Sequence, residues 1–232
     1  MQRIQLSLAV LCLGLAAAAC GQSINGAAKA DIDRRVAALQ PSSRAVDAPT
    51  AAEPMALAPG QWITLKNVDE EKRPSFVTYK VVGEEAGAYW IEVASETYYG
   101  KSAVRMQVFF GDRRDPHSFD IRYIASKNTD GHVEVVPQPL LGLLRKNYSA
   151  MLDAFAITWT ELPREDAAVI GGSFTGCFKG RSTVSFAGTS ATSDVWWHSA
   201  VPINGLVKSV GVDRPMTSEL VDFGLEGARS EF

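Results

Sequence analysis

Cys177, His198 and Asp194 are the residues of this sequence whose types could support nucleophilic catalysis. A cysteine nucleophile needs a base that lowers the pKa of its thiol and a third group that orients that base. Asp194 lies four residues before His198, so in a strand both side chains would share one face. The Gly176-Cys177 context contains no recognisable nucleophile signature, however, and free cysteine is among the most buried residue types. We therefore favour a buried structural thiol and keep an exported Cys/His hydrolase as an alternative.

Metal and phosphate chemistry have weaker support. The histidines His117, His132 and His198 are scattered, without a cysteine or carboxylate at zinc-site spacing. Gly171 and Gly172 are adjacent, but the GxxxxGK(S/T) pattern of a phosphate-binding loop is absent. The sequence therefore predicts no metal site, no cofactor-binding residue and no bound cofactor.

The N-terminal segment has the pattern of an export signal. Residues 1–3 contain Arg3, residues 4–15 are largely apolar, and four alanines ending at Ala19 precede Cys20. A positive start, a short apolar core and small residues at the end are typical of a signal peptide. The apolar run is shorter than the roughly 20 residues that a membrane span needs. We predict that residues 1–19 are a signal peptide cleaved after Ala19.

The residues before Cys20 resemble the bacterial lipobox, although Ala17 stands where leucine is commonest. This resemblance implies that signal peptidase II cuts before Cys20 and that the Cys20 sulfur carries diacylglycerol. Gly21 is not the aspartate associated with retention at the inner membrane, so we expect the periplasmic face of the outer membrane. The alternative is an ordinary signal ending in alanines, which leaves Cys20 as a thiol able to pair with Cys177.

Charge and composition define the class of the mature chain. Without Arg3 it carries 22 basic and 26 acidic residues, a net charge of −4. This balance argues against nucleic-acid binding, which needs clustered lysine and arginine. Residues 20–60 are rich in alanine, proline and serine, although Asp31 to Leu39 has helical spacing. Because such a composition buries little apolar surface, we predict a flexible tether over 20–60 and a single β-rich domain over 61–232.

Alternating apolar residues dominate the predicted domain. In residues 103–110, Val104, Met106 and Val108 would face one side of a strand and Arg105 the other. Similar alternation recurs before and after it, and Asp130-Gly131 is a hairpin signal. The fold class that we predict is mainly β (α+β), with a curved antiparallel sheet or half-barrel.

One amphipathic helix is predicted over about 140–156. Its apolar stripe includes Leu144, Tyr148, Met151 and Phe155. The favoured role is to cap one face of the sheet, and the alternative is a lid over a cavity for an apolar ligand.

Trp196 and Trp197 are adjacent, so in a strand they would face opposite sides. One would enter the core, and the other would cover an edge, a rim or a ligand. Together with Leu144, Tyr148, Met151 and Phe155, they are the candidate contacts for a lipid-like ligand.

The last third of the chain resembles a group of exported bacterial proteins of unknown function. Residues 172–177 (GSFTGC) are similar to a "PAGTFxC" strand, and residues 194–209 to "VWxSxxVPxxGLVK", with His198 in place of the usual serine. Those proteins are broadly similar to lipoprotein-sorting carriers with a curved sheet. The resemblance implies a fold and supplies no catalytic residue.

The sequence thus predicts a membrane-anchored exported lipoprotein whose domain is a binding or scaffold module, and it predicts no enzymatic activity. A carrier or sensor of an apolar ligand is the first alternative, and the Cys/His hydrolase is the second. The expected partners are a membrane, reached through the lipid on Cys20, and a lipid-like ligand or an envelope protein.

Overall fold

The computed structural model describes residues 23–49, 55–115, 118–141, 159, 161–186 and 189–232. These residues form one sheet of 12 strands. In chain order the strands are β1 (Ala45–Val46), β2 (Trp62–Val68), β3 (Pro74–Glu85), β4 (Ala88–Thr97), β5 (Gly100–Phe110), β6 (Phe119–Lys127), β7 (Val133–Val135), β8 (Arg164–Val169), β9 (Gly172–Phe186), β10 (Thr189–Trp197), β11 (Leu206–Gly211) and β12 (Thr217–Gly224).

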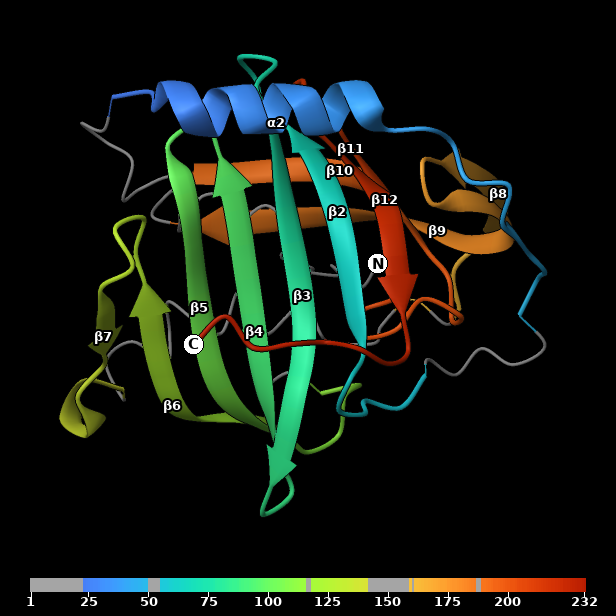
Figure 1. The fold of residues 1–232 in the computed structure, drawn as a ribbon. Helices are drawn as coiled ribbons and strands as arrows, with labels where there is room; N and C mark the ends of the chain where they lie inside the picture. Colours follow the sequence, from blue (N-terminus) through green and yellow to red (C-terminus); the bar gives the residue numbers. More distant parts are fainter. Residues whose placement is uncertain (1–22, 50–54, 116–117, 142–158, 160, 187–188) are drawn as a thin grey trace.

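The sheet is open and curved, as predicted. Its order is β1-β9-β10-β11-β12-β2-β3-β4-β5-β6-β7, with β8 on β9, and every pair except β1 with β9 is antiparallel. Figure 1 shows β2 to β5 running lengthwise, while β9 and β10 cross behind them at a steep angle. The strands therefore curve around one concave face, and the mainly β fold class is confirmed.

The core lies on this concave face and follows from the alternation in the sequence. On β2, Ile63 and Leu65 are buried, and on β5, Met106 and Val108 are buried. These side chains belong to one cluster that extends to Trp197 on β10. The convex face instead carries alternating charged residues, so the period of two in the sequence separates core from surface.

The hairpin between β3 and β4 has the local geometry that a tight turn requires. Ala86 and Gly87 have φ values of 50° and 73°. Positive φ at both central residues is the condition for a type I′ turn, whose twist matches that of the two flanking strands.

Residues 23–49 differ from the predicted flexible tether. They include helix α2 (Gly26–Ala38), which contacts β3, β4 and β5 and lies across one end of the sheet in Figure 1. Asn25 caps α2 by accepting hydrogen bonds from two backbone N–H groups, and Ile32 is 3% exposed. The guanidinium of Arg35 lies 3.9 Å from the centre of the Phe76 ring. One buried isoleucine, a cap and this cation–π contact thus hold a segment of low apolar content.

Strand β1 continues this ordered segment along β9. Ala45 and Val46 pair in parallel with Ser173 and Phe174. Gly172 permits this approach, because a Cβ there would lie 2.5 Å from the carbonyl oxygen of Arg44. Part of the predicted tether therefore forms an edge of the sheet.

Several predictions fall on residues outside the described ranges. They concern the signal peptide, the cleavage site at Ala19, the lipidation of Cys20 and nearly all of the helix over 140–156. Residues 138–141 are helical and Leu141 is buried, and the structure describes the chain again at Trp159. Within the described part of the chain, no helix has the length and apolar character of a membrane span.

Candidate functional site

Cys177 and His198 do come to the same end of two neighbouring strands. The pairing of β9 with β10 ends at Phe178 and Trp197, one residue from each. Cys177 has no exposed surface and His198 is 1% exposed. Asp194 does not orient His198, because it forms an ion pair of 2.9 Å with Arg181. The three residues therefore do not form a catalytic triad in this structure.

The protonation states of these two groups also differ from those of an activated thiol. Burial, together with the charge of Asp166, raises the pKa of the Cys177 thiol to about 12. Burial also lowers the pKa of His198, whose Nδ1 accepts a hydrogen bond of 3.1 Å from the N–H of Ala200. A thiol with a raised pKa and an imidazole with a lowered pKa are the reverse of the thiolate–imidazolium pair that cysteine hydrolases use.

Trp196 and Trp197 face opposite sides of β10, as the sequence predicts. Trp197 is 1% exposed and belongs to the core cluster. Trp196 is 8% exposed and belongs to the same cluster, and its indole N–H donates to Glu165 Oε1 over 3.1 Å. The amines of Lys179 and Lys208, its cross-strand neighbours, lie 4.7 and 5.4 Å from its ring centre. Trp196 is thus held by charged neighbours on its own sheet.

The structure describes two of the six residues that the sequence predicts as contacts for a lipid-like ligand. Trp196 and Trp197 lie on different faces, so the structure does not bring them together around one ligand. The other four candidates, Leu144, Tyr148, Met151 and Phe155, lie outside the described residues. A carrier of an apolar ligand remains a sequence-based prediction.

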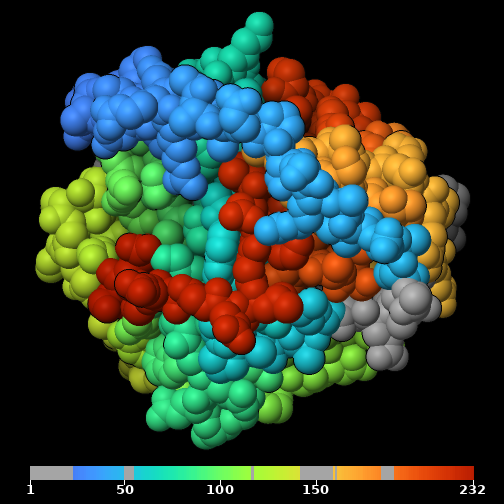
Figure 2. Space-filling view, turned by 45° about the vertical axis from the view of Figure 1, so that its right-hand side comes forward, coloured from blue at the N-terminus to red at the C-terminus, as the bar shows by residue number. Residues whose placement is uncertain are grey.

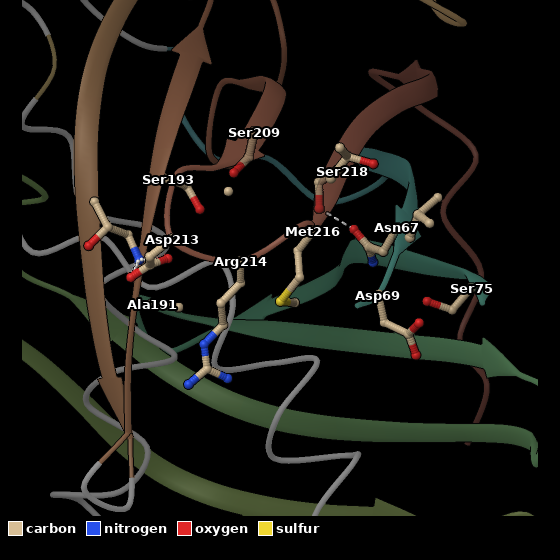
Figure 3. Close-up of a pocket in the computed structure, with 14 residues that line it drawn as sticks. Asn67, Asp69, Ser75, Ala191, Ser193, Ser209, Asp213, Arg214, Met216 and Ser218 are labelled. Carbon is tan, nitrogen blue, oxygen red and sulfur yellow. Dashed lines mark hydrogen bonds between the residues drawn. The ribbon is translucent and has the colours of Figure 1, made fainter. Parts of the chain in front are cut away.

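A notch lined by both polar and apolar residues opens at the end of the sheet where β2 ends and β12 begins, and Figure 3 shows its lining. Ser75, Asn67, Ser218 and Ser209 are successive cross-strand neighbours on β3, β2, β12 and β11. Ser218 Oγ bonds to Asn67 Oδ1. This row continues the concave face on which Leu65 is buried, so here hydroxyl and amide groups replace the apolar core. The cavity volume of about 60 Å³ is large enough for a few water molecules.

Charged side chains at the rim of the notch are already paired. Both carboxylate oxygens of Asp213 accept from the backbone N–H of Thr192 at 3.0 Å, and this hydrogen bond lowers the pKa of Asp213. Arg214 forms an ion pair of 3.1 Å with Glu70. The notch can hydrogen-bond a small polar group, but its carboxylate is not arranged as a general acid or base.

Glu92 is a buried carboxylate that the sequence analysis did not identify. It has no exposed surface, although it faces the convex side of β4. Arg105 Nε and a terminal nitrogen of Arg105 lie 2.8 and 2.6 Å from Glu92 Oε1. Ser230 Oγ and the N–H of Glu231 donate to Glu92 at 2.6 and 2.8 Å. Glu92 could have been identified only from the strand register. The register makes Lys80, Glu92 and Arg105 consecutive cross-strand partners, so their charges lie side by side.

Metal binding receives no support from the described ranges. Among these residues, no three histidine, cysteine, aspartate or glutamate side chains are close enough together to hold a metal ion. The absence of metal and cofactor stays a prediction from the sequence.

Comparisons with known proteins give little further information. No protein-family model matches the chain. No curated protein matches it either. Among solved structures, the chain is similar to a presumed exported protein with a YmcC-like fold from Bacteroides fragilis, at 12% identity and a TM-score of 0.32. The match covers 72% of this chain and 96% of that one. A similarity of this size carries no argument about function.

Proposed function

We propose that this chain is an exported lipoprotein, anchored through Cys20 at the periplasmic face of the outer membrane, whose β domain is a non-catalytic binding or scaffold module. The N-terminal pattern supports export and lipidation. Two or three acyl chains contribute about 0.8 kcal/mol per buried CH₂, which is enough to hold a domain at a membrane without a transmembrane helix.

The observation that carries the non-catalytic part is the state of Cys177. Its thiol has no exposed surface and a pKa raised to about 12, and His198 is buried as well. A side chain of this kind packs in a core and does not attack substrates. The groups that do reach the surface, in the notch and around Glu92, are hydrogen-bonding groups suited to binding.

Metabolic labelling with a radioactive fatty acid in a Gram-negative host tests the anchor. We expect label on the wild-type chain and none on Cys20→Ala. Cys12→Ala and Cys177→Ala are the matched controls, and both should keep the label because neither cysteine follows the run of small residues. Equal labelling of wild type and Cys20→Ala would refute the lipid anchor.

A further inference from the structure

Residues 226–232 lie across the convex face of the sheet, at an angle to the strands beneath them. Figure 1 shows this segment crossing β3 and β4, and Figure 2 shows it at the surface of the molecule. We call the segment the tail. It has no strand assignment, so side chains of the sheet hold it in place of a β-ladder.

The side chains beneath the tail form one row across neighbouring strands. Trp62, Lys80, Glu92 and Arg105 are consecutive cross-strand partners on β2, β3, β4 and β5, and Lys127 lies on β6 two residues beyond Ala125, the partner of Arg105. We call these five residues the tail groove. Strands lie about 4.8 Å apart, so the groove spans about 19 Å. Residues 226 to 231 are five steps of chain, which would span about 17 Å if fully extended at about 3.3 Å each.

Many of the hydrogen bonds between the groove side chains and the tail involve the main chain of the tail. The groove side chains form four such hydrogen bonds: Trp62 Nε1 to the carbonyl of Glu226 at 3.1 Å, Lys80 Nζ to the carbonyl of Arg229 at 3.0 Å, Lys127 Nζ to the carbonyl of Glu231 at 2.7 Å, and the N–H of Glu231 to Glu92 Oε2 at 2.8 Å. Every extended peptide offers these backbone groups. The groove therefore does not depend on one particular sequence for most of its hydrogen bonds.

Three consecutive tail side chains add selectivity. Ser230 Oγ donates to Glu92 Oε1 and accepts from Arg105. The carboxylate of Glu231 lies 2.5 Å from Lys80 Nζ. The ring centre of Phe232 lies 4.8 Å from the guanidinium carbon of Arg105. The groove thus fits a hydroxyl, a carboxylate and an aromatic ring in that order.

The surroundings of the buried Glu92 explain how the tail could leave this face and another segment could take its place. A buried carboxylate is costly unless charged or hydrogen-bonding partners surround it. Two of the donors to Glu92 come from the tail, and the ion pair with Arg105 stays with the sheet. When the tail leaves, Glu92 and Arg105 return to water together as an ion pair. Release of the tail therefore leaves no buried charge without a partner, and it breaks no pairing between β-strands.

We propose that the tail groove binds an extended segment of a partner protein that carries serine, an acidic residue and an aromatic residue in sequence. In this structure the tail occupies the groove as an intramolecular competitor. The groove has three cations against the single carboxylate of Glu92, and this net positive charge favours an acidic partner segment. The proposal deepens the binding role proposed above and does not depend on the lipid anchor.

A fluorescent peptide with the sequence of residues 226–232, EGARSEF, tests the proposal by fluorescence anisotropy. The protein is the full chain purified in mild detergent, as wild type and as a tail variant with Glu231→Lys and Phe232→Ala. We expect the tail variant to bind the peptide about tenfold more tightly than wild type. An attached competitor at an effective concentration of about 1 mM weakens a peptide with a Kd of about 100 μM by that factor.

Controls in the tail variant identify the site. Lys80→Gln combined with Lys127→Gln should weaken peptide binding at least tenfold, because both ammonium groups hold the tail main chain. Lys101→Gln is the matched control, since Lys101 lies on β5 with 74% of its side chain exposed and should have no effect. A scrambled peptide should bind at least tenfold more weakly. Thermal melting of each variant confirms folding.

Three outcomes would overturn the proposal. The first is equal affinity of wild type and the tail variant for the peptide. The second is peptide binding that survives both groove substitutions. The third is a concentration-dependent dimer of wild type that the tail variant does not form, which would identify a second copy of this chain as the occupant. None of these outcomes changes the labelling of Cys20, so failure of this inference is distinguishable from failure of the anchor.

Discussion

Replacing Cys177 with alanine should make the stability of the protein less sensitive to alkaline pH. The pKa of the Cys177 thiol is raised from its ordinary value of 9.0 to about 12, first by burial and then by the charge of Asp166. In the unfolded chain the thiol loses its proton near its ordinary pKa. Between these two values the unfolded state binds fewer protons than the folded state, so stability falls as pH rises.

The size of the effect follows from the two pKa values. At a pH of about 8 both states keep the proton, and the contribution is close to zero. At a pH of about 10.5 the unfolded thiol is ionised and the folded thiol is not, which lowers the free energy of unfolding by about 2 kcal/mol. Lysines and tyrosines also titrate in this range, but they do so in both proteins and cancel in the comparison.

Urea unfolding at these two pH values measures the difference. Both proteins carry Cys20→Ala, so that Cys177 is the mature chain's remaining cysteine. We expect the protein that retains Cys177 to lose about 2 kcal/mol more than Cys177→Ala on going from the lower pH to the higher. Equal losses in the two proteins would show that the thiol titrates alike in folded and unfolded chains, and the argument from burial would fail.

Alkylation by iodoacetamide checks the same thiol by its kinetics. With a pKa near 12 the thiolate population at neutral pH is about a thousandfold smaller than that of an ordinary cysteine. We expect the peptide that contains Cys177 to be labelled at least a thousandfold more slowly in the native protein than in urea. Native labelling within tenfold of the unfolded rate would refute this picture and support the hydrolase alternative.

Two further predictions concern packing. Trp197→Ala and Trp196→Ala should each lower the free energy of unfolding by about 3–5 kcal/mol in urea titrations, because the two rings are only 1% and 8% exposed. A loss below about 1 kcal/mol for either variant would contradict the burial of that ring. Gly205→Ala should cost about 1–3 kcal/mol in thermal melts, because φ is +72° and a Cβ would lie 2.9 Å from the Trp159 ring. Gly26→Ala is its control and should be neutral or stabilising, since nothing lies within 4 Å.

The sequence was informative where one face of a strand is buried and the other is not. Alternation predicted that Met106 and Val108 face the core, and the structure confirms this. Adjacency alone predicted that Trp196 and Trp197 face opposite sides. These successes share a cause, because the period of two is a local property of a strand and needs no knowledge of its neighbours.

The sequence was uninformative where distant segments cover the sheet. Alternation assigns Glu92 to the solvent face, but the group that covers it, Ser230, lies 138 residues further along the chain. The composition around α2 predicted a flexible tether because it counts apolar residues. It does not register a cap at Asn25 or the space that Gly172 leaves for β1. Such contacts depend on strand register and sheet curvature, which local patterns do not specify.

The position of α2 changes what a lipid on Cys20 would do to the domain. A tether over 20–60 would let the domain move freely, but α2 begins at Gly26, six residues after Cys20. Six extended residues reach at most about 20 Å. The end of the sheet that α2 covers would then stay close to the membrane. The turn between β3 and β4, at the opposite end in Figure 1, lies about 40 Å along β3 and would point away from it. The tail groove crosses the strands between these two ends, so an anchor at Cys20 would leave it open to a partner segment.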